Sequence, residues 1–216
     1  MTNFNKVIRF PPVTKMAAQC HVIRKQKQLA ALASAARQEI VDVLAEAGTL
    51  SVAEIAVILG RPADALYFHL RALKLAGLVR QAGYRYRGWR KEALFRTISP
   101  ELRLQYEPRS EPNRRAVTAI VSSMLRLGIR DFRRAFRRGD VIVAGRHREL
   151  WGLRRVSRLA LPQLAAVNRS IERIRQTTSK PKGRGRLYAV TVLLTPLDHR
   201  SRGANGNRKR AQAGKK

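Results

Sequence analysis

The 216-residue sequence predicts an α+β fold, in which an N-terminal unit of three helices and a β-hairpin precedes a smaller region of mixed helices and strands. Two features of the sequence support this prediction. Apolar residues recur every three or four positions through residues 31–76, and glycines end the periodic runs. After residue 77, short apolar runs interrupted by glycine and arginine replace that period, which is typical of a hairpin.

Capping signals delimit the first two helices. A helix is expected over residues 34–47, where Ser34 can cap the first turn. The next helix, 52–59, follows a capping box, in which the side chains of Ser51 and Glu54 accept hydrogen bonds from each other's backbone N–H groups. A glycine directly after each run indicates that both helices are short.

The third helix, expected over residues 63–76, has two distinct faces. At 100° per residue, Leu66, Leu70 and Leu73 point towards the core. The outer face and its flank carry polar, aromatic and basic side chains, namely Asp64, Tyr67, Phe68, Arg71 and Lys74. Two helices joined by a tight turn are a helix-turn-helix, and such an outer face suits the DNA major groove. Taken alone, the helix also fits an ordinary amphipathic helix whose outer face meets water.

A hairpin with a basic, aromatic tip is predicted directly after this helix. Its first strand begins at Leu78, and its second strand returns over residues 92–98. Three arginines lie at the tip of this predicted wing: Arg85, Arg87 and Arg90. They are expected to reach phosphates or the minor groove beside the third helix.

Four runs of this unit resemble the ArsR-like winged helix-turn-helix transcriptional regulators, over about residues 31–98. They are LASAARQEI (32–40), LSVAEIA (50–56), ALYFHLRAL (65–73) and AGLV (76–79). The resemblance implies a bacterial or archaeal regulator of the long form, which carries a C-terminal extension and binds a two-fold operator as a homodimer. With Arg61 in the preceding turn, the predicted DNA-binding residues are Arg61, Asp64, Tyr67, Phe68, Arg71, Lys74, Arg85, Arg87 and Arg90.

Metal, cofactor and catalytic sites are not expected. Metal-sensing members of the family carry cysteines on the second helix of the motif, and residues 51–59 hold none. The four histidines show no ligand spacing, and Cys20-His21 would need ligands from elsewhere. The sequence contains no phosphate-binding loop, nucleophile elbow or paired carboxylates, so we predict that the protein is not an enzyme.

The charge points to a polyanionic partner. Lysine and arginine number 45 against 14 acidic residues, which gives a net charge of +31, and every third of the chain is basic. Double-stranded DNA is the predicted partner of a sequence-specific regulator. A sequence-tolerant architectural nucleic-acid-binding protein is the alternative, and a module that binds acidic proteins is a third class. Neither a signal peptide nor an apolar run long enough for a membrane was found, so a cytoplasmic, nucleoid-associated protein is expected.

The predicted domain organisation places this unit between basic and flexible segments. Its parts are a basic arm (1–30), the DNA-binding domain (31–98), a linker (99–113), an α+β dimerisation or effector region (114–196) and a disordered basic tail (197–216). The region 114–196 is expected to contain helices near 117–136 and 162–174, and strands near 141–144, 154–161 and 187–194.

Two questions about this region stay open at the level of sequence. The apolar seam Leu164, Val167, Ile171 and Ile174 is assigned to a homodimer interface, although packing against the preceding helix of the same chain fits nearly as well. An unidentified small-molecule effector would need a pocket, for which Trp89, Trp151, Phe132 and Phe136 are candidates. Aromatic residues at helical spacing are more often core, and the core interpretation is favoured.

Overall fold

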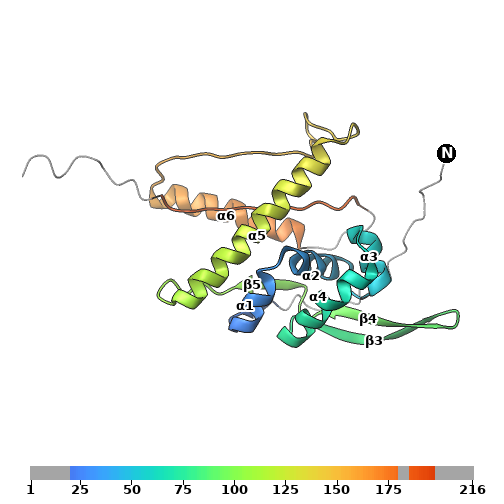
Figure 1. Ribbon diagram of the computed structural model, residues 1–216. Coiled ribbons are helices and arrows are strands. Elements are labelled where there is room, and N and C mark those ends of the chain that lie inside the picture. Colours follow the sequence, from blue (N-terminus) through green and yellow to red (C-terminus); the bar gives the residue numbers. More distant parts are fainter. Residues whose placement is uncertain (1–19, 180–184, 198–216) are drawn as a thin grey trace, which may run out of the picture.

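The computed structural model describes residues 20–179 and 185–197 and confirms the α+β fold (Figure 1). In chain order the elements are β1 (Cys20–Ile23), α1 (Gln26–Leu32), α2 (Ala35–Ala47), β2 (Leu50–Ser51), α3 (Val52–Leu59), α4 (Ala63–Ala76), β3 (Val79–Arg87), β4 (Arg90–Thr97), β5 (Glu101–Leu104), α5 (Glu111–Phe136) and α6 (Leu161–Thr178). The predicted tail, residues 197–216, lies outside the described residues apart from Leu197, and so do residues 1–19 of the arm.

Helices α2, α3 and α4 form where the sequence predicts them. The capping box is present, since the backbone N–H of Ser51 donates to the Glu54 carboxylate at 2.8 Å and the Glu54 N–H donates to the Ser51 hydroxyl at 3.3 Å. Gly60 and Gly77 end α3 and α4 in the left-handed region, with φ of 61° and 72°, which a residue with a Cβ rarely adopts. Ser34 occupies the N-cap of α2 without a side-chain hydrogen bond.

A three-stranded antiparallel sheet of order β2-β4-β3 carries the predicted hairpin. The hairpin closes at the pair Arg87 and Arg90, and its register shifts between Gln81 and Tyr84. Strand β2 pairs with β4 through Leu50 and Phe95. Because β2 leads directly into α3, this pairing fixes the base of the hairpin against the start of that helix.

Parts of the predicted arm and linker form secondary structure next to the domain. Residues 20–23 of the arm form β1, which pairs in parallel with β5 from the predicted linker. Helix α1 follows, and its Leu29 is fully buried in the core. Both strands are four residues long, so neither shows a period that local reasoning can detect, and their partner lies far away in the sequence.

One hydrophobic core joins these elements. Its buried members extend from Ile23 to Ile120, and they include the three leucines predicted to face inward from α4. The N-terminal half of α5 packs on α1 and α2 through Val117 and Ile120. At this contact the buried Gln38 amide donates to the carbonyl oxygens of Leu32, at 2.6 Å, and of Ile120, at 3.1 Å.

The predicted strands at 141–144, 154–161 and 187–194 are wrong. Among the described residues after Leu104, the structure contains α5, α6 and extended or looped segments, but no strand. The apolar alternation that suggested strands is present, but a strand also needs a paired edge, and these segments have none.

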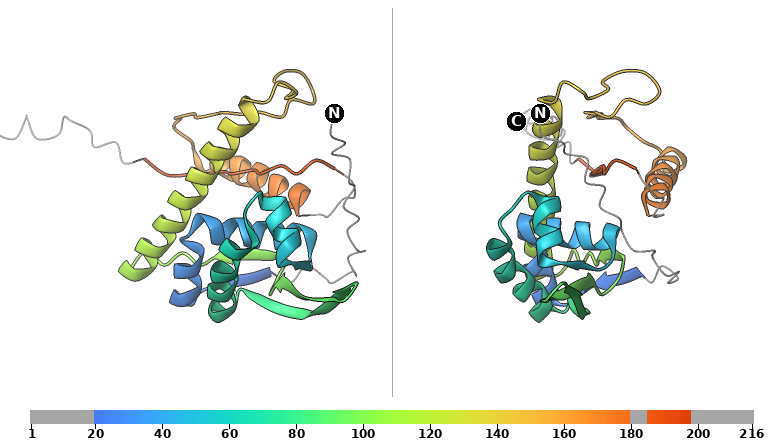
Figure 2. Two further views of the ribbon diagram at one scale, coloured as in Figure 1. Left: turned by 45° about the vertical axis from the view of Figure 1, so that its right-hand side comes forward. Right: turned by 90° about the vertical axis from the view of Figure 1, so that its right-hand side faces the viewer.

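In all three views of Figures 1 and 2, the C-terminal end of α5 and the hairpin lie at opposite ends of the molecule.

Candidate nucleic-acid interface

Helix α4 divides into a buried face and an exposed face as its sequence predicts. Leu66 and Leu73 have no exposed surface, whereas the Phe68 side chain is 70 % exposed and Tyr67 is also exposed. Asp64 lies in the first turn of the helix, and Lys74 lies in the last. The outer face therefore presents two aromatic rings, one carboxylate and two basic groups to solvent.

Arg71 and Lys74 are available for an external partner. Both side chains are exposed, and neither forms an ion pair or a side-chain hydrogen bond with any residue that the structure describes. Leu75 lies beside Lys74 and is also exposed, although it is not among the predicted contact residues. Its exposure follows from the helical period, because position 75 lies two residues from the buried Leu73.

Arg61 is held inside the domain. Its guanidinium lies 2.5 Å from the carboxylate of Glu39, which comes from α2 and is largely buried. The same carboxylate also binds Arg130 of α5 at 2.7 Å. Glu39 thus connects the turn before α4 to the long helix α5, a link that neither sequence segment reveals alone.

Arg85 is likewise engaged within the protein. It contacts Glu54 of α3 at 2.9 Å and Glu92 of the facing strand at 3.1 Å. The hydrogen bond to Glu92 is the largest of the interactions that raise the pKa of Arg85. Arg85 in turn holds the pKa of Glu92 below its usual value. These ion pairs fasten the hairpin to α3, so that the hairpin and α4 share one framework.

The hairpin tip carries the other predicted arginines. Arg87 and Arg90 flank the turn and are exposed, and Trp89 between them is fully exposed. The ammonium group of Lys91 lies 4.1 Å from the centroid of the Tyr84 ring. An exposed indole beside two guanidinium groups can lie against a sugar-phosphate backbone or a base edge.

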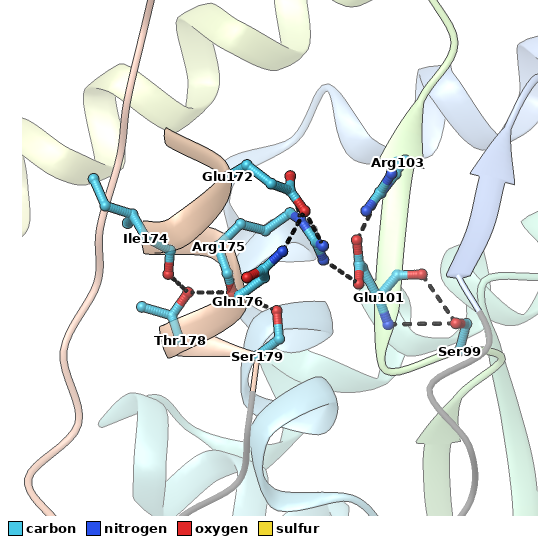
Figure 3. A network of polar contacts seen from close by, with 9 residues as sticks. All are labelled: Ser99, Glu101, Arg103, Glu172, Ile174, Arg175, Gln176, Thr178 and Ser179. Carbon is cyan, nitrogen blue, oxygen red and sulfur yellow. Dashed lines mark hydrogen bonds and ion pairs between the residues drawn. The ribbon is translucent and has the colours of Figure 1, made fainter. Parts of the chain in front are cut away.

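Helix α6 is attached to the body by polar contacts (Figure 3). Arg175 binds Glu101 of β5 at 2.7 Å and also pairs with Glu172 on its own helix, while Arg103 binds Glu101 at 2.6 Å. The pairing with Arg175 lowers the pKa of Glu172 to about 2. No residue of α6 is buried, and Ile174 of the predicted apolar seam is 42 % exposed.

The aromatic residues considered for an effector pocket are exposed. Trp89 lies at the hairpin tip, Phe132 and Phe136 stack on α5 with ring centroids 6.0 Å apart, and the Arg148 guanidinium covers the Trp151 ring. The favoured core interpretation is therefore wrong for all four side chains.

The part of the chain that the structure describes contains neither a metal-binding cluster nor a membrane-spanning helix. Within it, no three histidine, cysteine or acidic side chains gather where they could hold a metal ion, and Cys20 is exposed on β1. None of the described helices combines the length and apolar character needed to cross a bilayer.

Comparison with known proteins bears on the part of the chain that contains α4. Residues 32–82 match the family model of a helix-turn-helix domain, which spans α2, α3, α4 and the start of β3. No curated protein matches the chain. Among solved structures, the chain is similar to Rv1404 from Mycobacterium tuberculosis, with 13 % identity and a TM-score of 0.28 over 73 % of this chain and 86 % of that one. Residues 32–82 are therefore similar to a helix-turn-helix domain.

Proposed function

We propose that the protein is a sequence-specific transcriptional regulator, in which α4 enters the DNA major groove and the β3–β4 hairpin acts as a wing on the backbone or in the minor groove. One observation carries this proposal: Arg71 and Lys74 are exposed, have no ion pair with any described residue, and lie on a helix that shares a framework with the basic hairpin tip. The ArsR-like runs at residues 31–98 support the same assignment and imply a cytoplasmic bacterial or archaeal protein.

The predicted contact residues fall into two groups with different roles. Asp64, Tyr67, Phe68, Arg71 and Lys74 on α4, with Arg87 and Arg90 on the hairpin, are exposed and contact DNA directly. Arg61 and Arg85 would have to leave Glu39 and Glu54 to bind a phosphate, so in this proposal they mainly position α4 and the hairpin.

The regulator is proposed to be a homodimer formed chiefly through residues 114–196, because a two-fold operator requires a two-fold protein. Two observations support this. The C-terminal half of α5 exposes Leu125, Phe132 and Phe136, and the seam of α6 is only partly covered. A second copy of the chain would remove both apolar surfaces from water.

The decisive experiment selects a preferred duplex from random DNA and compares its affinity with that of unselected duplexes. A regulator prefers its site by about 10³-fold or more at physiological salt. Replacement Arg71→Ala is expected to weaken binding by about 1–3 kcal/mol and relax specificity at one base position, whereas Arg87→Ala weakens all sequences alike. Equal affinity for all duplexes would instead establish the architectural alternative.

A further inference from the structure

A row of arginines follows one face of the C-terminal half of α5, away from the surface proposed above. Arg126, Arg130, Arg133 and Arg137 fall within about 60° of one another at 100° per residue. The six buried residues of α5 lie on average about 100° from the centre of the row, although Ser123 lies only about 50° away, so the row borders the buried face and does not point into the core. At 1.5 Å per residue, the row is about 16 Å long.

Most of this row has no anionic partner among the residues that the structure describes. Arg130 is bound by Glu39 and Asp131, but Arg126, Arg133 and Arg137 form no ion pair with the carboxylates that the structure describes. All three side chains are exposed. The arginines and Ile129 line an open surface hollow of about 470 Å³. Like charges spaced this closely repel each other, and an external anion relieves that repulsion.

The position of the row determines what it can bind. The C-terminal end of α5 lies at the opposite end of the molecule from the hairpin (Figure 2). A duplex bound by α4 therefore does not run along this row. One DNA strand presents a row of phosphates, about one every 3.4 Å along the axis. A row of guanidinium groups can therefore contact the phosphates of one strand of a second duplex.

We infer that the arginine face of α5 binds the phosphate backbone of a second DNA duplex, so that the protein bridges two DNA segments. This inference rests on the proposed function, because the first of the two duplexes is the one that α4 binds. Contact with phosphates gives the α5 face no sequence preference, and its affinity falls steeply with salt.

A capture assay tests this inference. One duplex is fixed to beads, and the protein is asked to retain a second, fluorescent duplex of unrelated sequence. The test variant is Arg126→Ala, Arg133→Ala and Arg137→Ala together. The control variant is Arg154→Ala, Arg155→Ala and Arg158→Ala, which removes the same charge from an exposed segment whose arginines form no ion pair in the described structure. Circular dichroism shows whether each variant retains its helices.

The wild-type protein and the control are expected to retain the second duplex, and the test variant is expected to lose most of this capture while binding a single duplex with unchanged sequence preference. Equal loss in both variants would show that net charge alone is responsible and would overturn the inference. Unchanged capture by the test variant would also overturn it. Binding of each variant to polyglutamate is measured as well. If the test variant bridges DNA normally but no longer binds polyglutamate, the partner of the α5 face is an acidic protein segment and the inference is overturned.

A second background separates this result from the proposed function. In the variant Arg71→Ala and Lys74→Ala, the sequence preference is expected to disappear while binding through α5 persists. A plot of log affinity against log salt has a negative slope. Adding the three α5 substitutions to this background should make that slope less steep by about 2–3, at roughly 0.9 per lost phosphate contact. An unchanged slope would overturn the inference and leave the role of α4 intact.

Discussion

The two halves of the described chain differ in what holds them together. Residues 20–120 share one core, in which buried apolar side chains extend from Ile23 to Ile120, and Leu127 is the last buried apolar residue described. Beyond Leu127, no described apolar side chain is buried, although isoleucine, leucine, valine and aromatic residues are frequent there. Polar contacts replace the core in that half: Glu149 accepts hydrogen bonds from Arg186 at 2.8 Å and from the Tyr188 hydroxyl at 2.5 Å.

This difference shows that hydrophobic composition alone does not make a core. Apolar residues are frequent in both halves. Among the described residues, only the first half has paired strands and helices packed around a common core. Exposed apolar side chains in large number are typical of a surface that meets another molecule. The contrast between the halves therefore makes predictions about stability and assembly.

The largest effect on stability is expected in the first half. Replacement Leu73→Ala empties a fully buried position on α4 and should lower the free energy of unfolding by about 2–5 kcal/mol. The matched replacement Leu161→Ala, at an exposed position on α6, should change it by less than about 0.5 kcal/mol. Urea denaturation measures both values. Equal losses would mean that the second half is also a packed core in solution.

The next prediction concerns assembly through the second half. Replacement Ile171→Glu places a carboxylate in the apolar seam of α6, and burying that charge against a second copy is costly. The variant should sediment as a folded monomer with much weaker affinity for the selected DNA site. An unfolded variant would assign the seam to the core of its own chain, and a dimeric variant would place the interface elsewhere. Ala165→Glu, at an exposed position of the same helix, adds the same single negative charge and is the control.

A smaller effect tests the connection between the halves. Replacement Glu39→Gln removes the carboxylate shared by Arg61 and Arg130. Because both arginines are about one-third exposed, the expected loss of stability is about 1 kcal/mol rather than that of a fully buried pair. The free energy of DNA binding should weaken by more than the free energy of unfolding, because Arg61 lies in the turn before α4 and positions that helix. Replacement Glu46→Gln, at an exposed position of α2, controls for the lost charge. Unchanged DNA affinity would exclude a positioning role for Glu39.

The smallest effect is a pH dependence at the junction of α2 and α5. Desolvation of the carboxyl group raises the pKa of Asp42 from 3.8 to about 6, and the negative charges of Glu39 and Asp131 contribute to the same shift. A raised acid pKa destabilises the folded protein above pH 6, and this penalty disappears as the pH falls from 6 to below 4. Replacement Asp42→Asn should therefore raise the melting temperature slightly at pH 7.5 and not at pH 3.5. The effect is small because the side chain retains contact with solvent, and an equal shift at both pH values would contradict it.

The sequence by itself determined the helices of the DNA-binding unit and their faces. Ser51 and Glu54 cap α3, Gly60 and Gly77 end α3 and α4, and Leu66 faces the core, because each of these properties depends on residues within a few positions of one another.

Only the tertiary structure decided the pairings between distant segments. The register of β1 with β5, the capture of Arg61 by Glu39 and the contact of Arg85 with Glu54 join residues whose separation in the chain no local period encodes. For the same reason an alternating run such as 187–194 does not become a strand, since a strand depends on hydrogen bonds to a partner edge that the run itself does not contain.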